Sequence, residues 1–258
     1  MKLGVCTKLQ NIELIKSFGY DYIELKLRDV AEMTEAELSE ARTILESHSM
    51  LAETYNLFCP PDINLSYAAD EYEISAYTRR ALANAQKLGG EIIVIGNGKL
   101  RNIPEEYSFD EGRDRFKRVL SLVSDIASDH NIKVAIEPLN TNETNLINTL
   151  ADASAICAEV GKPNLGFIAD LFHMYKNGES VEEIEKYGDQ IIHTHIARRN
   201  DMRGAPSIED GADDLREFHD TLTKIGYKSR ISLEASSKND FETSVKKFAE
   251  LADHLKIR

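Results

Sequence analysis

The chain has 258 residues, of which 42% are hydrophobic and 29% are charged, the balance of an ordinary globular protein. Asp and Glu number 44 and Lys and Arg 31, so the formal net charge is −13. Such a charge repels nucleic-acid phosphates and anionic membranes, so neither is an expected partner. The length suits either two average domains or one large one.

The cysteines and the N-terminal segment bear on the cellular compartment. Cys6, Cys59 and Cys157 are odd in number, lie far apart and form no C-x-x-C pair. We interpret them as reduced core thiols of a cytosolic protein. The apolar run at the N-terminus ends after Cys6, too early for a signal peptide. No stretch reaches the ~18 apolar residues of a membrane span, so a cytoplasmic protein is expected.

Short apolar segments rich in β-branched residues alternate with longer amphipathic ones along the chain. Eight strands are predicted: 3–6, 22–25, 51–56, 91–96, 133–137, 165–170, 191–196 and 230–234. Eight helices are predicted with them: 9–18, 34–48, 72–89, 110–130, 149–160, 180–187, 213–226 and 240–255. Capping boxes are predicted at the start of two helices, formed by Thr34 with Glu37 and by Ser108 with Glu111. Two helices are predicted to end at glycines, at Gly89-Gly90 and at Gly226.

This strict strand-then-helix order implies parallel strands joined by right-handed crossovers. Eight repeats allow the sheet to close and leave no exposed edge. The predicted fold class is α/β, a single (β/α)8 TIM barrel, and residues 1–258 form one domain because no linker interrupts them. A doubly wound open sheet is the alternative. No G-x-G-x-x-G or Walker loop accompanies it, and Gly96-Asn97-Gly98 is a weak phosphate loop.

Metal-competent side chains stand at the ends of the last four predicted strands: Glu137, Asp170, His195 and Glu234. In a barrel of this kind, chemistry gathers at the ends of the strands. A single Glu or His there is usually solvated or hydrogen-bonded, but carboxylates that converge from four neighbouring strands would repel one another without a cation. Three carboxylates and one imidazole favour one Mn²⁺, with Mg²⁺ or Co²⁺ possible, over a structural zinc.

His193 and His195 are two residues apart on one predicted strand, so their side chains share a face. His195 is nearer the C-terminal end of the strand and is the expected ligand. His193 is expected one layer deeper, hydrogen-bonded in the barrel interior.

These segments together resemble the xylose isomerase-like barrel superfamily, in particular its sugar phosphate isomerase/epimerase branch. That branch includes ketose 3-epimerases, hydroxypyruvate isomerases and inosose dehydratases. The resemblance covers nearly the whole chain and rests on four motifs in order: Glu137-Pro138-Leu139-Asn140 with Glu143 (E-P-x-N-x-x-E), Asp170-Leu171-Phe172-His173-Met174 (D-x-x-H-M), His193-Thr194-His195 (H-x-H) and Glu234 on the last strand. Each motif alone is moderately specific, and the ordered set is highly specific.

The resemblance implies a role for each of these residues. Glu137, Asp170, His195 and Glu234 would bind the metal, while Glu143, His173 and an arginine after the seventh strand would contact substrate. Arg203, which precedes a Gly-Ala-Pro turn, is the expected arginine, and Arg199 stays open. Arg198, Arg199 and Arg203 either bind a phosphorylated sugar or are solvated loop charges. Thr141-Asn142 departs from the arginine and aromatic residue of many members, which leaves the substrate open.

The chemistry that the resemblance implies is proton transfer next to a carbonyl, through a metal-stabilised enediolate. Glu137 and Glu234, on opposite sides of the ion, are the expected acid/base pair. The chain is therefore expected to be a sugar or sugar phosphate isomerase/epimerase, most similar to ketose 3-epimerases. A dehydratase of a keto-cyclitol or keto acid, as in the inosose and dehydroshikimate branches, is the alternative, and a non-catalytic sugar-binding barrel is third. A homo-oligomer is compatible with these features.

Overall fold

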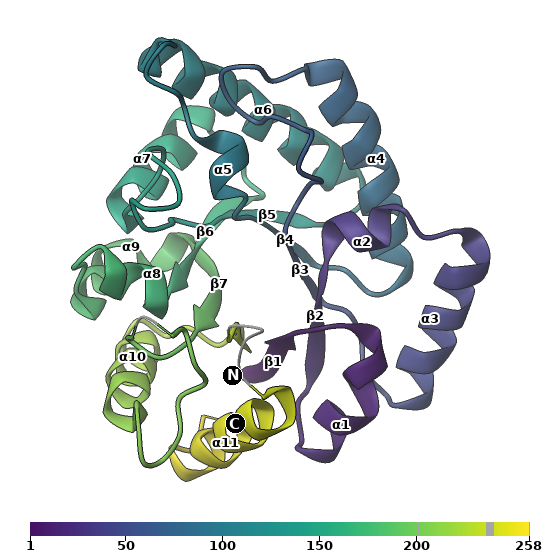
Figure 1. Ribbon diagram of the computed structural model, residues 1–258, viewed down its shortest axis with the longest axis vertical. Helices are drawn as coiled ribbons and strands as arrows, with labels where there is room; N and C mark the ends of the chain where they lie inside the picture. The colour runs from purple at the N-terminus through teal and green to yellow at the C-terminus, as the bar shows by residue number, and fades with distance from the viewer. Residues whose placement is uncertain (201, 236–239, 258) are drawn as a thin grey trace.

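The structure is a computed structural model that describes residues 1–200, 202–235 and 240–257. Its strands are all parallel and close into a barrel in chain order, with helices around the outside (Figure 1). The strands are β1 (Lys2–Cys6), β2 (Tyr22–Lys26), β3 (Thr54–Asn56), β4 (Ile92–Ile95), β5 (Lys133–Ile136), β6 (Leu165–Asp170), β7 (Ile191–Ile196) and β8 (Arg230–Leu233). The predicted TIM barrel is confirmed, and the open sheet is wrong.

The longer helices correspond to predicted segments. They are α3 (Glu35–Ser47), α4 (Glu71–Lys87), α6 (Phe109–Asp129), α7 (Leu150–Val160), α10 (Ala212–Lys224) and α11 (Phe241–His254). The other two predicted helices each divide into 3-10 and α-helical pieces: η1 (Leu9–Asn11) with α1 (Ile12–Ser17), and η2 (Val181–Glu183) with α9 (Ile184–Tyr187), followed by η3 (Gly188–Gln190). No helix in the described ranges is long and apolar enough for a membrane crossing.

Three short helices were not predicted, so the expected count of eight helices is wrong. They are α2 (Leu27–Ala31), α5 (Gly98–Arg101) and α8 (Leu171–Lys176), and each lies in the loop after a strand. Their lengths of four to six residues are too short for a repeating apolar face, the signal by which helices are predicted.

The predicted helix caps are mostly confirmed. Thr34 and Glu37 form both halves of a capping box at the start of α3. At α6 the Ser108 side chain accepts a hydrogen bond from the Glu111 N–H at 3.3 Å, and this one bond caps the helix without the return bond of a box. Gly89, with φ +92°, follows α4 and Gly226, with φ +75°, follows α10, so both helices end where a left-handed residue permits a turn.

Six of the eight strands differ from the predicted bounds, by one to three residues at one end or both. β3 begins at Thr54, three residues later than predicted, and the Leu51 side chain is 45% exposed. β5 ends at Ile136 and β8 at Leu233, so Glu137 and Glu234 are the first residues after their strands. Both glutamates therefore stand in the C-terminal mouth of the barrel rather than within its wall.

The barrel interior is partly polar. A Cβ on Gly4 would lie 2.1 Å from Cζ of Tyr22, so the absence of a side chain in β1 makes room for that ring. The Tyr22 hydroxyl is 2.7 Å from the Ser232 hydroxyl, while Arg230 at the N-terminal end donates to Glu53 at 2.6 Å. A small apolar cluster fills the other side: Ile92, Val94, Ala135 and Ile168.

Glu179, after α8, is a half-buried carboxylate that is only partly hydrogen-bonded. Its Oε1 accepts a bond from the Leu150 N–H at 3.0 Å, whereas its buried Oε2 has no partner among the described residues. Burial raises the pKa of Glu179 from 4.5 to about 7, although the bond from Leu150 opposes the shift. The pKa of Glu179 is higher in the folded protein than its ordinary value of 4.5, so the protonated side chain is the form that the fold favours. The contribution of Glu179 to the free energy of unfolding is therefore fully present below pH 4.5 and is lost as the pH rises through about 7.

We expect Glu179→Gln to raise the free energy of unfolding at pH 8 by about 1–3 kcal/mol, because the amide removes the buried charge. Thermal denaturation from pH 5 to pH 8 should then show a flatter pH dependence than in the wild type. Glu182→Gln, at an exposed neighbouring glutamate, is the control. Equal pH dependence in the wild type and Glu179→Gln would contradict the prediction.

Candidate metal centre

Four metal-competent side chains meet in the C-terminal mouth of the barrel: Glu137, Asp170, His195 and Glu234. One ligand atom from each lies within 4.8 Å of the others. The register of the parallel strands explains this, because Asp170 pairs with His195, and His195 pairs with Ser232, two residues before Glu234. The structure thus brings together the four residues that the sequence singles out. Their role as ligands stays a prediction.

His195 faces all three carboxylates through one nitrogen. Its Nδ1 lies 3.4 Å from Oε1 of Glu137, 3.9 Å from Oδ2 of Asp170 and 3.2 Å from Oε2 of Glu234. Glu137, Asp170 and His195 are buried, and only the Glu234 side chain, 21% exposed, reaches solvent. Buried carboxylates at this spacing require positive charge nearby.

The positive charge in the cluster is unevenly distributed. Burial would raise the pKa of Asp170, but His173 and Arg203 lower it to about 2. Burial is likewise outweighed at Glu234, whose pKa Arg203 and His195 hold below its ordinary value. At Glu137, by contrast, burial and the charge of Glu234 raise the pKa. The cluster therefore has one carboxylate more than its cations satisfy, and three oxygen donors with one nitrogen fit a divalent ion.

Glu24, in the middle of β2, is a fully buried residue beneath the cluster that the sequence analysis missed. Its Oε1 lies 2.9 Å from Nε2 of His195, and its Oε2 lies 2.9 Å from Nε2 of His193. It also accepts bonds from the hydroxyls of Thr54 at 2.8 Å and Ser232 at 2.6 Å. The prediction that His193 lies one layer deeper and is hydrogen-bonded is confirmed.

Glu24 determines which nitrogen of His195 is available to a metal. Burial would raise the pKa of Glu24, but His195 and His193 hold it well below its ordinary value, so it is a carboxylate that only accepts. His195 therefore donates from Nε2 to Glu24, and Nδ1, which faces the three carboxylates, is the nitrogen that would ligate a metal after losing its own proton. Cys6, Glu24 and His195 also lie within 4.8 Å of one another. Both oxygens of Glu24 are already occupied, so the four-residue cluster fits a metal better.

His173 and Glu143 lie beside the cluster, as neighbours rather than members. His173 is buried in α8, with Nε2 3.9 Å from Oε1 of Glu137 and 3.8 Å from Oδ2 of Asp170. Its Nδ1 accepts a bond from the Asn140 N–H at 3.2 Å, so Nε2 carries the proton and points toward the carboxylates. Glu143 accepts from the Asn140 amide at 2.8 Å, and its side chain is 44% exposed.

Arg203 reaches into the mouth from the loop after β7. Its guanidinium donates to Oδ2 of Asp170 at 3.0 Å and makes a short hydrogen bond to Oε2 of Glu234. The guanidinium carbon lies 4.8 Å from the ring centre of Phe172. Arg203 adopts a φ of +46°, which is uncommon for a residue with a side chain and typical of strained backbone at functional sites.

The other two arginines of this loop point elsewhere. Arg199 lies 3.4 Å from Asp214 and 3.3 Å from Glu217, both on α10. Arg198 forms a short ion pair with Asp210. The structure therefore places Arg203, not Arg199, at the cluster, and the three arginines do not converge on one phosphate site.

Gly96 and Arg101, which the sequence analysis did not assign, support Glu137. A Cβ on Gly96 would lie 1.8 Å from Oε2 of Glu137, so only glycine leaves room for this carboxylate. Arg101 is fully buried and donates to the carbonyl of Glu137 at 2.6 Å and to that of Ile95 at 3.0 Å. A buried arginine thus ties β4 to the backbone of Glu137.

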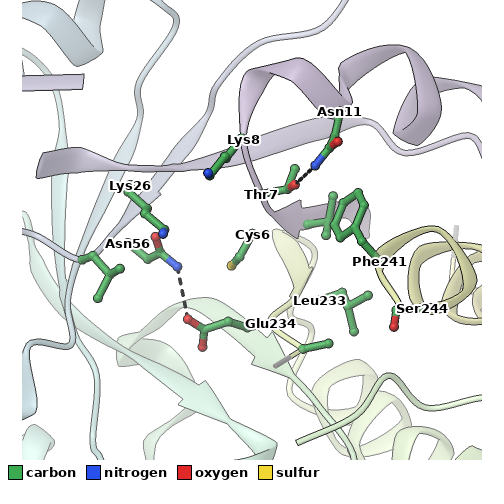
Figure 2. Close-up of a pocket in the computed structure, with 13 residues that line it drawn as sticks. Cys6, Thr7, Lys8, Asn11, Lys26, Asn56, Leu233, Glu234, Phe241 and Ser244 are labelled. Carbon is green, nitrogen blue, oxygen red and sulfur yellow. Dashed lines mark hydrogen bonds between the residues drawn. The ribbon is translucent and has the colours of Figure 1, made fainter. Parts of the chain in front are cut away.

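A cavity of about 330 Å³ lies beside Glu234 (Figure 2). Residues at the ends of β1, β2, β3 and β8 and from α11 line it. Asn56 donates to Oε1 of Glu234 at 3.1 Å across one wall. Cys59 and Cys157 are free, buried thiols, as predicted, but Cys6 is half-buried and lines this cavity, so it is not a core residue.

Comparison with known proteins identifies the family to which this geometry belongs. The xylose isomerase-like TIM barrel family matches residues 12–258. The chain belongs to this family. It is 30% identical over 230 residues to a D-psicose 3-epimerase of Agrobacterium fabrum, covering 86% of this chain and 77% of that one. It is 26% identical over 236 residues to an inosose isomerase of Bacillus velezensis, covering 87% and 82%. The chain thus has sugar epimerases and isomerases as distant homologues.

Solved structures agree with the fold. A D-psicose 3-epimerase crystallised in the presence of D-fructose has a TM-score of 0.83 and 24% identity, covering 100% of this chain and 97% of that one. The IOLI protein with a bound zinc atom has a TM-score of 0.77 and 21% identity, with coverage of 100% and 97%. Of these two barrels of the same fold, one was crystallised in the presence of a ketose and the other holds a zinc atom.

We expect Glu24→Gln to weaken divalent-metal affinity by about 10- to 100-fold, because a neutral amide cannot accept from both imidazoles and His195 loses its fixed orientation. Titration with Mn²⁺ measures the effect. Glu40→Gln, an exposed change on α3, is the control. Unchanged Mn²⁺ affinity in a folded Glu24→Gln protein would show that Glu24 does not orient the ligand.

Proposed function

We propose that the protein is a divalent-metal-dependent sugar isomerase/epimerase that transfers a proton at a carbon next to a carbonyl, most similar to a ketose 3-epimerase. The observation that carries this proposal is the position of Glu137 and Glu234. They are the outer members of a cluster whose donors fit a divalent ion, directly after β5 and β8, and β6 and β7 lie between these strands. The homology to epimerases and isomerases of sugars supports the same class.

Glu137, Asp170, His195 and Glu234 would hold one ion. Three carboxylates and one imidazole favour Mn²⁺, with Mg²⁺ and Co²⁺ as alternatives, and the zinc in a homologous barrel adds zinc to the ions to be tested. The bound ion would supply Lewis acidity toward the oxygens of the substrate.

Glu137 and Glu234 would suit a two-base reaction on a substrate bound between them. A carbon next to a ketone is a weaker acid than glutamic acid by a dozen or more pK units, a gap on the order of 15–20 kcal/mol. Positive charge and positioning must therefore assist any glutamate that removes its proton. Glu137 would remove the proton, and Glu234 would return one on the opposite face, which inverts the carbon.

The neighbouring residues would orient the sugar. Nε2–H of His173 and the guanidinium of Arg203 both point to the carboxylate cluster, so they can donate to the carbonyl end and its hydroxyls. The exposed carboxylate of Glu143 would accept from a hydroxyl at the open side. This arrangement leaves proton transfer to the two glutamates and assigns binding to the others.

We expect one Mn²⁺ per chain by elemental analysis, and Asp170→Asn should weaken Mn²⁺ binding by at least about 10-fold because it removes one anionic ligand. His173→Ala and Glu143→Gln should lower turnover and leave the metal content near one. Loss of the ion in either of these two variants would place that residue among the ligands.

The reaction is tested with free ketoses and ketose phosphates incubated with the Mn²⁺-loaded protein in D2O. Deuterium at the carbon next to the carbonyl, together with an epimerised product, would support the proposal. A conjugated product that absorbs ultraviolet light would identify a dehydratase of the inosose type instead. No exchange with any ketose would contradict the proposed epimerase.

We expect Glu234→Gln to lower steady-state turnover by roughly 10²–10⁴-fold, because an amide cannot carry the proton. Its remaining oxygen should allow partial metal binding. Deuterium exchange by Glu137 should persist with one epimer of the substrate while net conversion stops.

The matched control is Glu106→Gln at an exposed glutamate far from the acid/base pair in sequence. Near-normal turnover of metal-loaded Glu234→Gln would show that Glu234 is only a ligand, and the two-base mechanism would then be wrong.

A further inference from the structure

The C-terminal mouth of the barrel has a basic side that the proposed reaction does not use. Lys8 and Lys26 line the cavity beside Glu234 (Figure 2). We propose that these two lysines bind an anionic group, a phosphate ester or a carboxylate, at the end of the sugar away from the reacting carbonyl. The inference rests on the proposed function and narrows its substrates to phosphorylated or acidic ketoses.

Lys26 reaches the cavity because of its position in β2. Tyr22, Glu24 and Lys26 are spaced two residues apart, so their side chains lie on one face of the strand. Tyr22 and Glu24 are buried in the barrel, where they contact Ser232. Lys26 is therefore the next inward-facing residue, at the mouth. Its Cα pairs in register with that of Asn56, which also lines the cavity.

Lys8 reaches the same cavity from β1. The strand ends at Cys6, but the backbone of Lys8 is still extended, with φ −103° and ψ 155°. Strand alternation therefore continues and places Lys8 on the side of Cys6, which also lines the cavity. Figure 2 shows both lysines on the side of the cavity near Cys6 and Asn56. Two ammonium groups from neighbouring strands thus face one space.

Neither ammonium has a carboxylate partner in the described part of the chain. Several other lysines do have one; for example, Lys2 lies 2.6 Å from Glu53, and Lys162 lies 2.6 Å from Asp125. The chain carries a net charge of −13, so acidic partners are plentiful. Two lysines that face a cavity without such partners make a local positive field that attracts an anion.

Asn56 provides a second, independent observation. The residue is 6% exposed, and its amide nitrogen donates to Glu234 at 3.1 Å. Its Oδ1 is buried and has no hydrogen-bond partner among the described residues. Buried acceptors are nearly always satisfied, so this oxygen is suited to receive a hydroxyl of a bound sugar. Asn56 links the reacting end at Glu234 to the lysine side of the cavity.

The mouth is therefore divided by charge. Its β5–β8 side holds the excess of carboxylates, and its β1–β2 side holds the two lysines that have no carboxylate partner among the described residues. A neutral ketose matches only the first side. A sugar with oxygens for a metal at one end and an anion at the other matches both sides. Arg198 and Arg199 do not compete with the lysines for this anion, because each is paired with an acidic side chain.

The test measures binding of three compounds that cannot react: D-arabinitol, D-arabinitol 5-phosphate and D-arabinonate. Each is titrated by calorimetry into the full chain loaded with Mn²⁺. We expect one of the anionic compounds to bind about 100-fold more tightly than D-arabinitol, because both ammonium groups donate to it. Lys8→Gln and Lys26→Gln should each weaken that binding by about 10- to 100-fold, the range for one hydrogen bond to a charged group.

The double variant should bind the anion no better than D-arabinitol. Lys133→Gln, at the N-terminal end of β5, removes the same charge at the opposite mouth and should leave the affinity unchanged. The preferred compound identifies the anion as phosphate or carboxylate. Equal binding of all three compounds, or tight anion binding that survives in the double variant, would overturn the inference; the second result would place the anion at the metal or at Arg203.

This readout does not depend on turnover, so it separates the two proposals. Lysine-dependent binding of an anion without turnover of any ketose would support the site and contradict the proposed reaction. Epimerisation of free ketoses without lysine-dependent anion binding would support the reaction and overturn the inference.

Discussion

The bonds between Glu24 and two imidazoles are the interaction on which the C-terminal mouth of the barrel depends. A fully buried carboxylate is costly unless its oxygens are satisfied, and Glu24 has four donors: His193, His195, Thr54 and Ser232. These bonds hold three strands besides β2 at one axial level. They also turn Nδ1 of His195 toward the carboxylates above. The position of a candidate ligand is therefore determined one layer below the site, in the rigid interior.

The balance of charge along the barrel axis favours this mouth as the candidate metal site. At the N-terminal end Arg230 pairs with Glu53 and Glu91, and in the middle Glu24 is satisfied by its donors. At the C-terminal end Arg203 contacts only two of the three carboxylates, and the pKa of Glu137 is raised by burial and by Glu234. Of the described layers, this one has the excess of negative charge that a dication would offset.

The sequence was sufficient where strand geometry determines position. Parallel strands of a barrel end at one mouth, so residues such as Asp170 and Glu234 at strand ends come together once the topology is known. Glu24 was missed because its partners lie 169 and 171 residues away and no local motif marks it. The available signal was an ionisable residue between Ile23 and Leu25, in a strand whose flanking residues are buried. Such a residue needs partners inside the barrel.

Loop side chains were less predictable, because their direction depends on backbone turns and on nearby helices. Arg203 reaches the cluster through a left-handed φ, while acidic residues near or on α10 hold Arg198 and Arg199 away. Lys26, in contrast, follows from strand alternation, since it shares a face with Glu24. The clustered carboxylates come from the ends of β5–β8, and the lysines without a carboxylate partner among the described residues come from β1–β2, so different strands would carry the two proposed functions. A change of charge on the β1–β2 side would then leave the proposed proton-transfer residues in place, and one barrel could serve substrates of different charge.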